Sequence, residues 1–296
     1  MIETRLMRYS MKKIPESFGL DIAKVLEVED SHSSEVFKVI LASGEIVYVK
    51  YPYSKLKYQR ELDSFNILNE KVRIPKLLDY NSETFLLSEL KGRPLSKNDP
   101  PNISYQVGVL HAKLHNVQPE KDTVYSGIKN EFPHWNTFVE QMFEGFKENV
   151  KSAIDKDLYH KSILKFEQMK NNLPEPDGPC FIHMDFRPAN IIVDEDTVTG
   201  VIDFESVRFG SSEIDFTKIY RDYLRFDADV FAAYKEGYRS VRPLIDLSLV
   251  LPFYEFTNAF MSIGWCVKRG ITENQSFYDA SLETLISIIN GEEPRE

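Results

Sequence analysis

One stretch, residues 181–205, constrains this chain more than any other, because it places three oxygen-bearing side chains around a short hairpin. A brief apolar run leads into a loop with Asp185 and Asn190, and two β-rich runs joined by an acidic turn follow within residues 191–202. Asp203 comes directly after the second run. Since a hairpin brings its ends together, we expect Asp203 beside Asn190, with Asp185 close by. Such oxygen ligands suit Mg²⁺, and the stretch predicts a phosphoryl-transfer site.

Composition limits the classes of partner. The chain has 296 residues, enough for two lobes, and its 42% hydrophobic and 28% charged content is ordinary for a soluble enzyme. A formal net charge of -10 argues against a nucleic-acid partner, because phosphate-backbone binding needs a basic surface. The acidic balance suits a cationic acceptor, but solubility explains it equally well.

Cysteine usage and hydropathy indicate the compartment. Cys180 and Cys266 form no metal-ligand or disulfide pattern, which fits a reducing environment. Charges interrupt every apolar run near the start, and the most apolar later stretch, residues 247–265, contains Pro252 and Glu255. We therefore expect a cytoplasmic protein with no membrane partner.

The first part of the chain is typical of a nucleotide-binding lobe, predicted over residues 1–90. Lys50 ends a β-rich run, and Glu61 follows in a segment whose apolar residues recur at helical spacing. A strand lysine and a helix glutamate in this order orient the lysine toward nucleotide phosphates. Five short β-rich runs are expected to form an antiparallel sheet: 25–28, 36–41, 46–49, 76–78 and 84–87.

Two loops of this lobe are candidate nucleotide contacts. The polar loop after the first run carries Ser31, Ser33 and Ser34, whose hydroxyls and backbone N–H groups are expected to cover phosphates. An ordinary hairpin turn is the alternative. Ser88, Glu89 and Leu90 precede a Gly- and Pro-containing linker, and their backbone is expected to bind the adenine edge.

Helical periodicity dominates the second predicted lobe, residues 91–296. His111 and His115 stand at i, i+4, a spacing that can hold a metal, but no third ligand is obvious and a core role is favoured. The spacing of apolar residues predicts one amphipathic helix over 135–150, with its aromatic stripe in the core. Another helical region, 244–265, is expected to break near Pro252.

Each task of phosphoryl transfer finds a suitable residue type. Asp185 can hydrogen-bond an acceptor hydroxyl and take its proton, a role that depends on placement. Asn190 and Asp203 supply oxygen ligands for Mg²⁺, and Lys50 holds the phosphates.

Three linked motifs carry a resemblance. The run HMDFRPAN at 183–190 resembles the H-x-D-x-x-x-x-N catalytic loop of the aminoglycoside phosphotransferase and choline kinase family. IDFE at 202–205 resembles the family's metal-binding segment, and residues 210–215 resemble the G-x-x-x-x-D segment, with Asp215 expected to brace the loop.

The resemblance covers approximately residues 20–290 and implies a two-lobed α+β fold of the protein-kinase type, with a small five-stranded antiparallel lobe and a larger, mainly helical one. It implies that ATP or GTP binds with Mg²⁺ between the lobes and that the C-terminal helices hold a small-molecule hydroxyl acceptor. The residues it assigns are His183 and Asp185 for catalysis and Asn190, Asp203 and Glu205 for the metal.

The sequence also departs from the family. Met184 and Ala189 stand where glycines are frequent, which predicts altered loop packing or a narrower acceptor pocket. Glu205 replaces the glycine of protein kinases and no A-P-E segment follows, so a protein Ser/Thr kinase is the less favoured enzyme. A nucleotide-binding regulatory module without catalysis is the second alternative.

The acceptor stays open between an antibiotic such as an aminoglycoside and an amino alcohol, sugar or amino acid, and the chain is expected to be a monomer or homodimer. Side chains considered for an acceptor site are the acidic Asp222, Asp227 and Glu255 and the aromatic Tyr220, Tyr223, Tyr254 and Trp265, all of which also suit helix packing or solvation.

Overall fold

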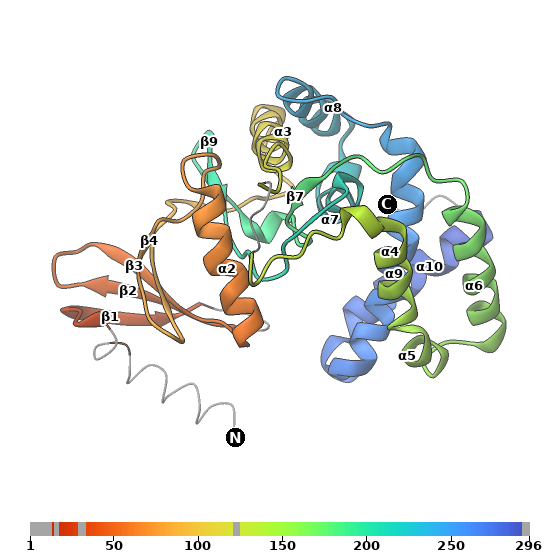
Figure 1. The fold of residues 1–296 in the computed structure, drawn as a ribbon, viewed down its shortest axis with the longest axis horizontal. Coiled ribbons are helices and arrows are strands. Elements are labelled where there is room, and N and C mark those ends of the chain that lie inside the picture. The colour runs from red at the N-terminus through yellow and green to blue at the C-terminus, as the bar shows by residue number, and fades with distance from the viewer. Residues whose placement is uncertain (1–13, 15–17, 29–33, 121–124, 292–296) are drawn as a thin grey trace.

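The computed structural model describes residues 14, 18–28, 34–120 and 125–291. It has two lobes, with a sheet and helix α2 on one side of the molecule and most helices on the other (Figure 1). The predicted α+β architecture of the protein-kinase type is confirmed.

The small lobe is a five-stranded antiparallel sheet in the order β1-β2-β3-β5-β4. Because successive side chains of a strand point to opposite faces of the sheet, Phe37, Val39, Val47 and Val49 share one face and form a small core. The strands are β1 (Ile22–Glu27), β2 (Glu35–Leu41), β3 (Ile46–Tyr51), β4 (Leu77–Tyr80) and β5 (Phe85–Ser88).

Helix α2 (Lys55–Leu68) follows the third strand and packs on the sheet. Ser54 caps its first turn by accepting a hydrogen bond from the N–H of Lys57. Phe65 lies edge-on against Phe85 of β5, with ring centroids 5.7 Å apart. This packing holds the α2 side chains in a defined position relative to β3.

Two small sheets carry the central stretch. β6 (Arg93–Pro94) pairs with β8 (Ile191–Asp194), which forms a hairpin with β9 (Thr197–Val201). β7 (Cys180–Ile182) pairs with β10 (Arg208–Gly210). The chain leaving the small lobe therefore joins the same sheet as the hairpin between the candidate metal ligands.

The large lobe is helical. Its α-helices are α3 (Pro101–His115), α4 (Trp135–Glu144), α5 (Lys147–Lys151), α6 (Lys156–Lys170), α7 (Phe216–Asp222), α8 (Ala228–Arg239), α9 (Leu247–Arg269) and α10 (Gln275–Asn290). Short 3-10 helices cover Phe132–His134, Pro188–Asn190, Ser212–Asp215, Leu224–Phe226 and Thr272–Asn274. Among the described helices, none combines the length and the apolar character needed to cross a membrane.

Two helix predictions are wrong. The single helix expected over 135–150 is two helices, because the chain turns at Gly145, a poor helix former, before α5 begins. The break expected near Pro252 is absent, and α9 is continuous. Proline has no N–H to donate to the carbonyl of Ser248, one turn earlier in the helix. Both residues are exposed, so water can hydrogen-bond to that carbonyl.

Helices α3 and α8 cross at a contact that only glycine allows. A Cβ on Gly237 would lie 1.9 Å from the backbone oxygen of Tyr105, and a Cβ on Gly108 would lie 2.1 Å from that of Tyr234. Each helix thus contributes one glycine, and the two backbones approach directly.

The Gly237→Ala variant is expected to destabilise the fold by about 2 kcal/mol or more, because the added methyl must push two packed helices apart. The free energy of unfolding in urea measures this. Gly145→Ala is the matched control, since Gly145 has an ordinary helical φ of -60° and its Cβ would meet no atom nearer than 3.3 Å. Equal stability of the two variants would contradict the close-contact explanation.

Candidate active site

A buried lysine joins the two lobes. Lys50, on β3, is 5% exposed, and its Nζ lies 2.9 Å from Glu61 Oε1 on α2 and 2.9 Å from Asp203 Oδ1 after the hairpin. Glu205 Oε1 lies 3.2 Å from the same nitrogen. Burial would lower the pKa of Lys50, but the three carboxylates outweigh it and raise the pKa above its ordinary value. The lysine is therefore charged.

Negative charge exceeds what Lys50 alone offsets. Burial raises the pKa of Glu61 to about 7, against the lowering effect of Lys50, and the charges of Asp203 and Glu205 raise it further. A site with surplus carboxylates is suited to a further cation.

The hairpin delivers Asp203 to Asn190, as predicted. Ile191 pairs with Val201, and the N–H of Ile202 donates to the Asn190 carbonyl at 2.9 Å. Asp203 adopts a left-handed φ of 70°, and its side chain is 37% exposed. The Asn190 amide nitrogen donates to Asp185 Oδ2 at 3.0 Å, which assigns the amide oxygen as its free ligand atom. The donor set fits Mg²⁺.

Asp185 lies next to this pair and is held by two cations. Lys218 Nζ lies 2.6 Å from Asp185 Oδ1, and Arg187 Nε lies 3.2 Å from Oδ2. Burial would raise the pKa of Asp185, but Lys218 and Arg187 outweigh it and hold the pKa below its usual range. Asp185 is ionised at neutral pH and can accept a hydrogen bond from a hydroxyl.

Lys218, which pairs with Asp185, was not among the site residues predicted from the sequence. It lies on α7, three residues after Asp215. The sequence signal was its helical spacing from the aspartate expected to brace the loop.

Asp215 braces the catalytic loop from behind. Its carboxylate accepts the backbone N–H of His183 at 2.5 Å and of Met184 at 2.6 Å. Met184 has a φ of 66°, a left-handed conformation that explains why glycine is favoured at this position. The His183 ring is fully buried and donates from Nε2 to the Ile202 carbonyl at 3.0 Å, so this side chain joins the loop to the hairpin.

His111 and His115 support the same aspartate. Their Nε2 atoms lie 3.6 and 3.3 Å from Asp215 Oδ2, and their Nδ1 atoms lie 2.6 and 2.8 Å from the hydroxyls of Tyr234 and Tyr238. Burial lowers the pKa of both imidazoles, that of His111 to about 3. Neutral rings that accept from tyrosine and face Asp215 agree with the predicted core role, although the three side chains lie close enough to share a cation.

Of the three serines expected to cover phosphates, Ser34 alone lies among the described residues. Ser31 and Ser33 lie outside the described residues. Ser34 is buried, its hydroxyl donates to Glu205 Oε1, and it accepts the backbone N–H of Tyr53 at 3.0 Å. Glu205 also pairs with Lys57 at 2.7 Å. In this arrangement Ser34 and Glu205 bind each other, and their contacts with phosphate and metal stay predictions.

The segment expected to bind adenine lies at the end of the small sheet. Ser88 ends β5, and its hydroxyl accepts the N–H of Lys76 at 2.9 Å. Glu89 pairs through its side chain with Lys38 at 3.2 Å. These contacts order the segment, and a base contact by Ser88, Glu89 and Leu90 stays a prediction.

Most of the side chains considered for the acceptor have structural roles. Tyr223 and Tyr254 are 2% and 1% exposed, and Asp227 caps α8 by accepting two backbone N–H groups. Tyr254 also lines the smaller of the two hollows described below. Asp222 binds the guanidinium of Arg221 through both oxygens, at 2.6 and 2.7 Å.

Glu255 predicts a pH effect on stability. Burial raises its pKa to about 7, although the charges of Arg225 and Arg221 lower it. Because the pKa of Glu255 is higher in the folded than in the unfolded state, its protonation contributes to the free energy of unfolding. This contribution is complete below about pH 4 and is lost as the pH rises to about 7. Between pH 5 and pH 8 the wild type should lose on the order of 2 kcal/mol more unfolding free energy than Glu255→Gln. Parallel curves for the two proteins would contradict this assignment.

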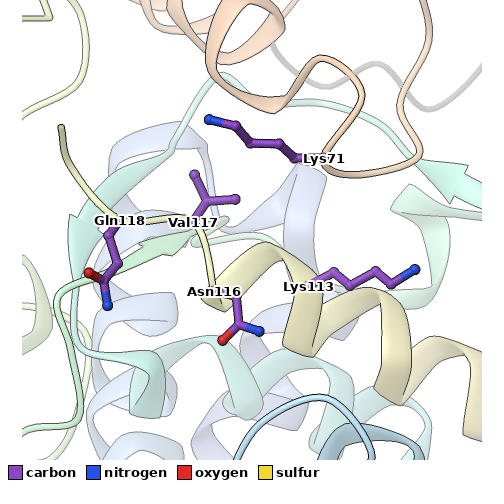
Figure 2. A pocket seen from close by; sticks show the side chains of 5 residues that line it. All are labelled: Lys71, Lys113, Asn116, Val117 and Gln118. Atoms are coloured by element: carbon purple, nitrogen blue, oxygen red, sulfur yellow. The ribbon is translucent and has the colours of Figure 1, made fainter.

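Two hollows differ in chemistry. One, of about 130 Å³, is lined among others by Met184, which precedes Asp185 in the chain, and by Lys218, which pairs with Asp185. The other, of about 340 Å³, lies between Lys71, after α2, and Lys113 and Asn116 at the end of α3 (Figure 2). Lys218, which pairs with Asp185, lines the first hollow, whereas no described residue that contacts Asp185 lines the second, so the first is the acceptor-site candidate.

Comparisons with known proteins agree with this fold. The profile of the phosphotransferase enzyme family matches residues 24–244. The chain is similar in structure to the GDP and kanamycin complex of APH(2")-IIia, with 16% identity, 96% of this chain and 99% of that chain covered, and a TM-score of 0.75.

Two further solved structures share the fold. Macrolide 2'-phosphotransferase MphH from Brachybacterium faecium is 16% identical, with 97% of this chain and 98% of that chain covered and a TM-score of 0.70. A thermostable mutant of aminoglycoside phosphotransferase APH(4)-Ia is 15% identical, with 95% and 98% covered and a TM-score of 0.72.

Proposed function

Because the chain belongs to the phosphotransferase enzyme family, we propose that it transfers the γ-phosphate of ATP or GTP to a hydroxyl group of a small molecule in a Mg²⁺-dependent reaction. The observation that carries this proposal is the contact of Lys50 with both Glu61 and Asp203, next to the Asp185–Asn190 pair. These groups come from both lobes and match the tasks of phosphoryl transfer.

Each residue receives one role. Lys50, oriented by Glu61, binds the phosphates of the nucleotide. Asn190 and Asp203 would hold Mg²⁺, with Glu205 as a further candidate ligand. When bound, the ion would offset the charge of the phosphates. His183 positions the loop that carries Asp185.

Asp185 acts on the acceptor. Its ionised carboxylate accepts the hydrogen bond of the acceptor hydroxyl and orients the oxygen toward the γ-phosphorus. As the new P–O bond forms and the bond to the nucleoside diphosphate breaks, the proton of the hydroxyl passes to Asp185. Two solved relatives of this fold carry nucleotide and acceptor together, APH(2")-IIia with GDP and kanamycin and an APH(4)-Ia variant with AMP-PNP and hygromycin B.

Two measurements test the proposal. Thermal unfolding should shift upward with Mg-ATP or Mg-GTP, because a ligand that binds only the folded state stabilises it. An ADP-release screen over aminoglycosides, macrolides, amino alcohols, sugars, amino acids and mixed proteins should find turnover with a small molecule. Stabilisation by nucleotide without turnover of any acceptor would favour the non-catalytic module. Turnover with the mixed proteins alone would favour a protein kinase.

A further inference from the structure

The cavity beside Asp185 has an unexpected charge for an acceptor site. Nine residues line it, none of them carries a carboxylate, and its one charged side chain is Lys218. Its apolar wall consists of Met142, Met184, Ile214 and Met261. The inference drawn from it rests on the proposed function.

Lys218 occupies the position that an acceptor hydroxyl needs. Its Nζ lies 2.6 Å from Asp185 Oδ1, while Asn190 already donates to Oδ2. A hydroxyl that takes the place of Lys218 at Oδ1 leaves the ammonium group without its counter-ion in a partly buried site. The Lys218 side chain is 29% exposed, so an anion on the acceptor can replace that counter-ion.

Other polar groups of the cavity also offer donors. Arg221 donates to Asn258 Oδ1 at 2.7 Å, which leaves the amide N–H groups of Asn258 as its remaining polar atoms. The Thr217 hydroxyl is buried, lines the cavity and makes no hydrogen bond within the part of the chain that the structure describes. A ligand group that only accepts hydrogen bonds, such as a carboxylate or phosphate, satisfies these donors.

The acidic groups nearby are already matched by arginine. Asp222 binds Arg221 through both oxygens, and Glu255 lies in the field of Arg221 and Arg225. Arg187 adds a further positive charge at Asp185. An acceptor with several ammonium groups would be repelled by these positively charged side chains, and no carboxylate among the described residues lines the cavity to bind it.

We propose that the acceptor is a hydroxyl compound that bears a carboxylate or phosphate, and that this anion binds Lys218 and so frees Asp185 for the acceptor hydroxyl. Lys218 keeps its proton and moves from Asp185 to the anion. The hydroxyl then donates to Asp185 Oδ1, and transfer proceeds with that proton passing to Asp185. The apolar part of the acceptor packs on the methionines of the cavity. This departs from the cationic acceptor that the net charge of -10 allowed.

Matched acceptors test the proposal through the release of ADP from Mg-ATP or of GDP from Mg-GTP. One set is glycerate, glycerol phosphate, glycerol and aminopropanediol. A second set consists of benzyl alcohols that carry a carboxylate, a phosphate, a hydroxymethyl or an aminomethyl group at the para position of the ring. Kanamycin represents acceptors with several positive charges. An anionic member should have the highest kcat/KM, and comparison of carboxylate with phosphate identifies which anion is used. Highest kcat/KM for an amine or neutral compound would overturn the inference while leaving the proposed function intact. No turnover with any compound would overturn both.

Variants of Lys218 test the contact itself. Lys218→Met should raise KM for the anionic acceptor at least about tenfold, the loss expected for one charge-assisted hydrogen bond. Lys218→Glu should shift preference toward the amine of the same set. Lys161→Met is the matched control, because it removes a lysine from a 2.7 Å ion pair with Asp157 on the surface. Unchanged KM values and an unchanged order of preference in both Lys218 variants, with normal nucleotide-induced stabilisation, would refute the role of Lys218.

Discussion

Asp185→Asn is expected to lower kcat by roughly 1000-fold, because an amide cannot take the proton of the acceptor hydroxyl and general-base catalysis contributes on that scale. The dissociation constant for Mg-ADP should change little, since Asp185 contacts Lys218, Arg187 and Asn190 rather than Lys50. ADP release and calorimetric nucleotide binding measure the two quantities.

The control for this prediction is Asp157→Asn, which removes a carboxylate with a 73% exposed side chain that also pairs with a lysine. Its kcat should equal that of the wild type. Near-normal turnover in Asp185→Asn would show that another group receives the proton.

Asp215→Asn is expected to cost about 3 kcal/mol of unfolding free energy and to lower activity as well. The buried carboxylate accepts the backbone N–H groups of His183 and Met184 and lies against two buried imidazoles. An asparagine has one acceptor oxygen, so a backbone N–H of His183 or Met184 loses its partner, and breaking a buried network costs about this much. Urea denaturation and kcat are the measurements.

Asp227→Asn is the matched control. Asp227 also accepts two backbone N–H groups, but at the exposed start of α8, where asparagine is an equally good cap. Its stability should change by only a few tenths of a kcal/mol. If Asp215→Asn were equally mild, the brace would not hold the catalytic loop.

Local patterns made much of the site predictable. The hairpin places Asp203 at Asn190 because two short β-rich runs flank a turn, and register then follows from chain geometry. The lysine at the end of β3 and the glutamate on α2 follow from strand and helix periodicity. The five-stranded sheet was predictable for the same reason.

Contacts that depend on helix packing were not predictable. Lys218 reaches Asp185 because α7 starts directly after the loop brace, and no spacing rule links residues so far apart in the chain. The turn at Gly145 and the continuity of α9 through Pro252 depend on solvent exposure and neighbouring helices. The change of expectation for the acceptor likewise comes from contacts in three dimensions, since Arg221 pairs with Asp222 and the charges of Arg221 and Arg225 act on Glu255.

The most direct test of a metal-dependent nucleotide site at Asp203 and Asn190 is calorimetric titration of ADP with and without Mg²⁺. The wild type should bind ADP at least about tenfold more tightly with the ion, a difference of about 1.4 kcal/mol. In Asp203→Asn the ion should have little effect, while binding of metal-free ADP is retained. Wild-type affinity that is indifferent to Mg²⁺, or an ion effect that survives in Asp203→Asn, would contradict the assignment.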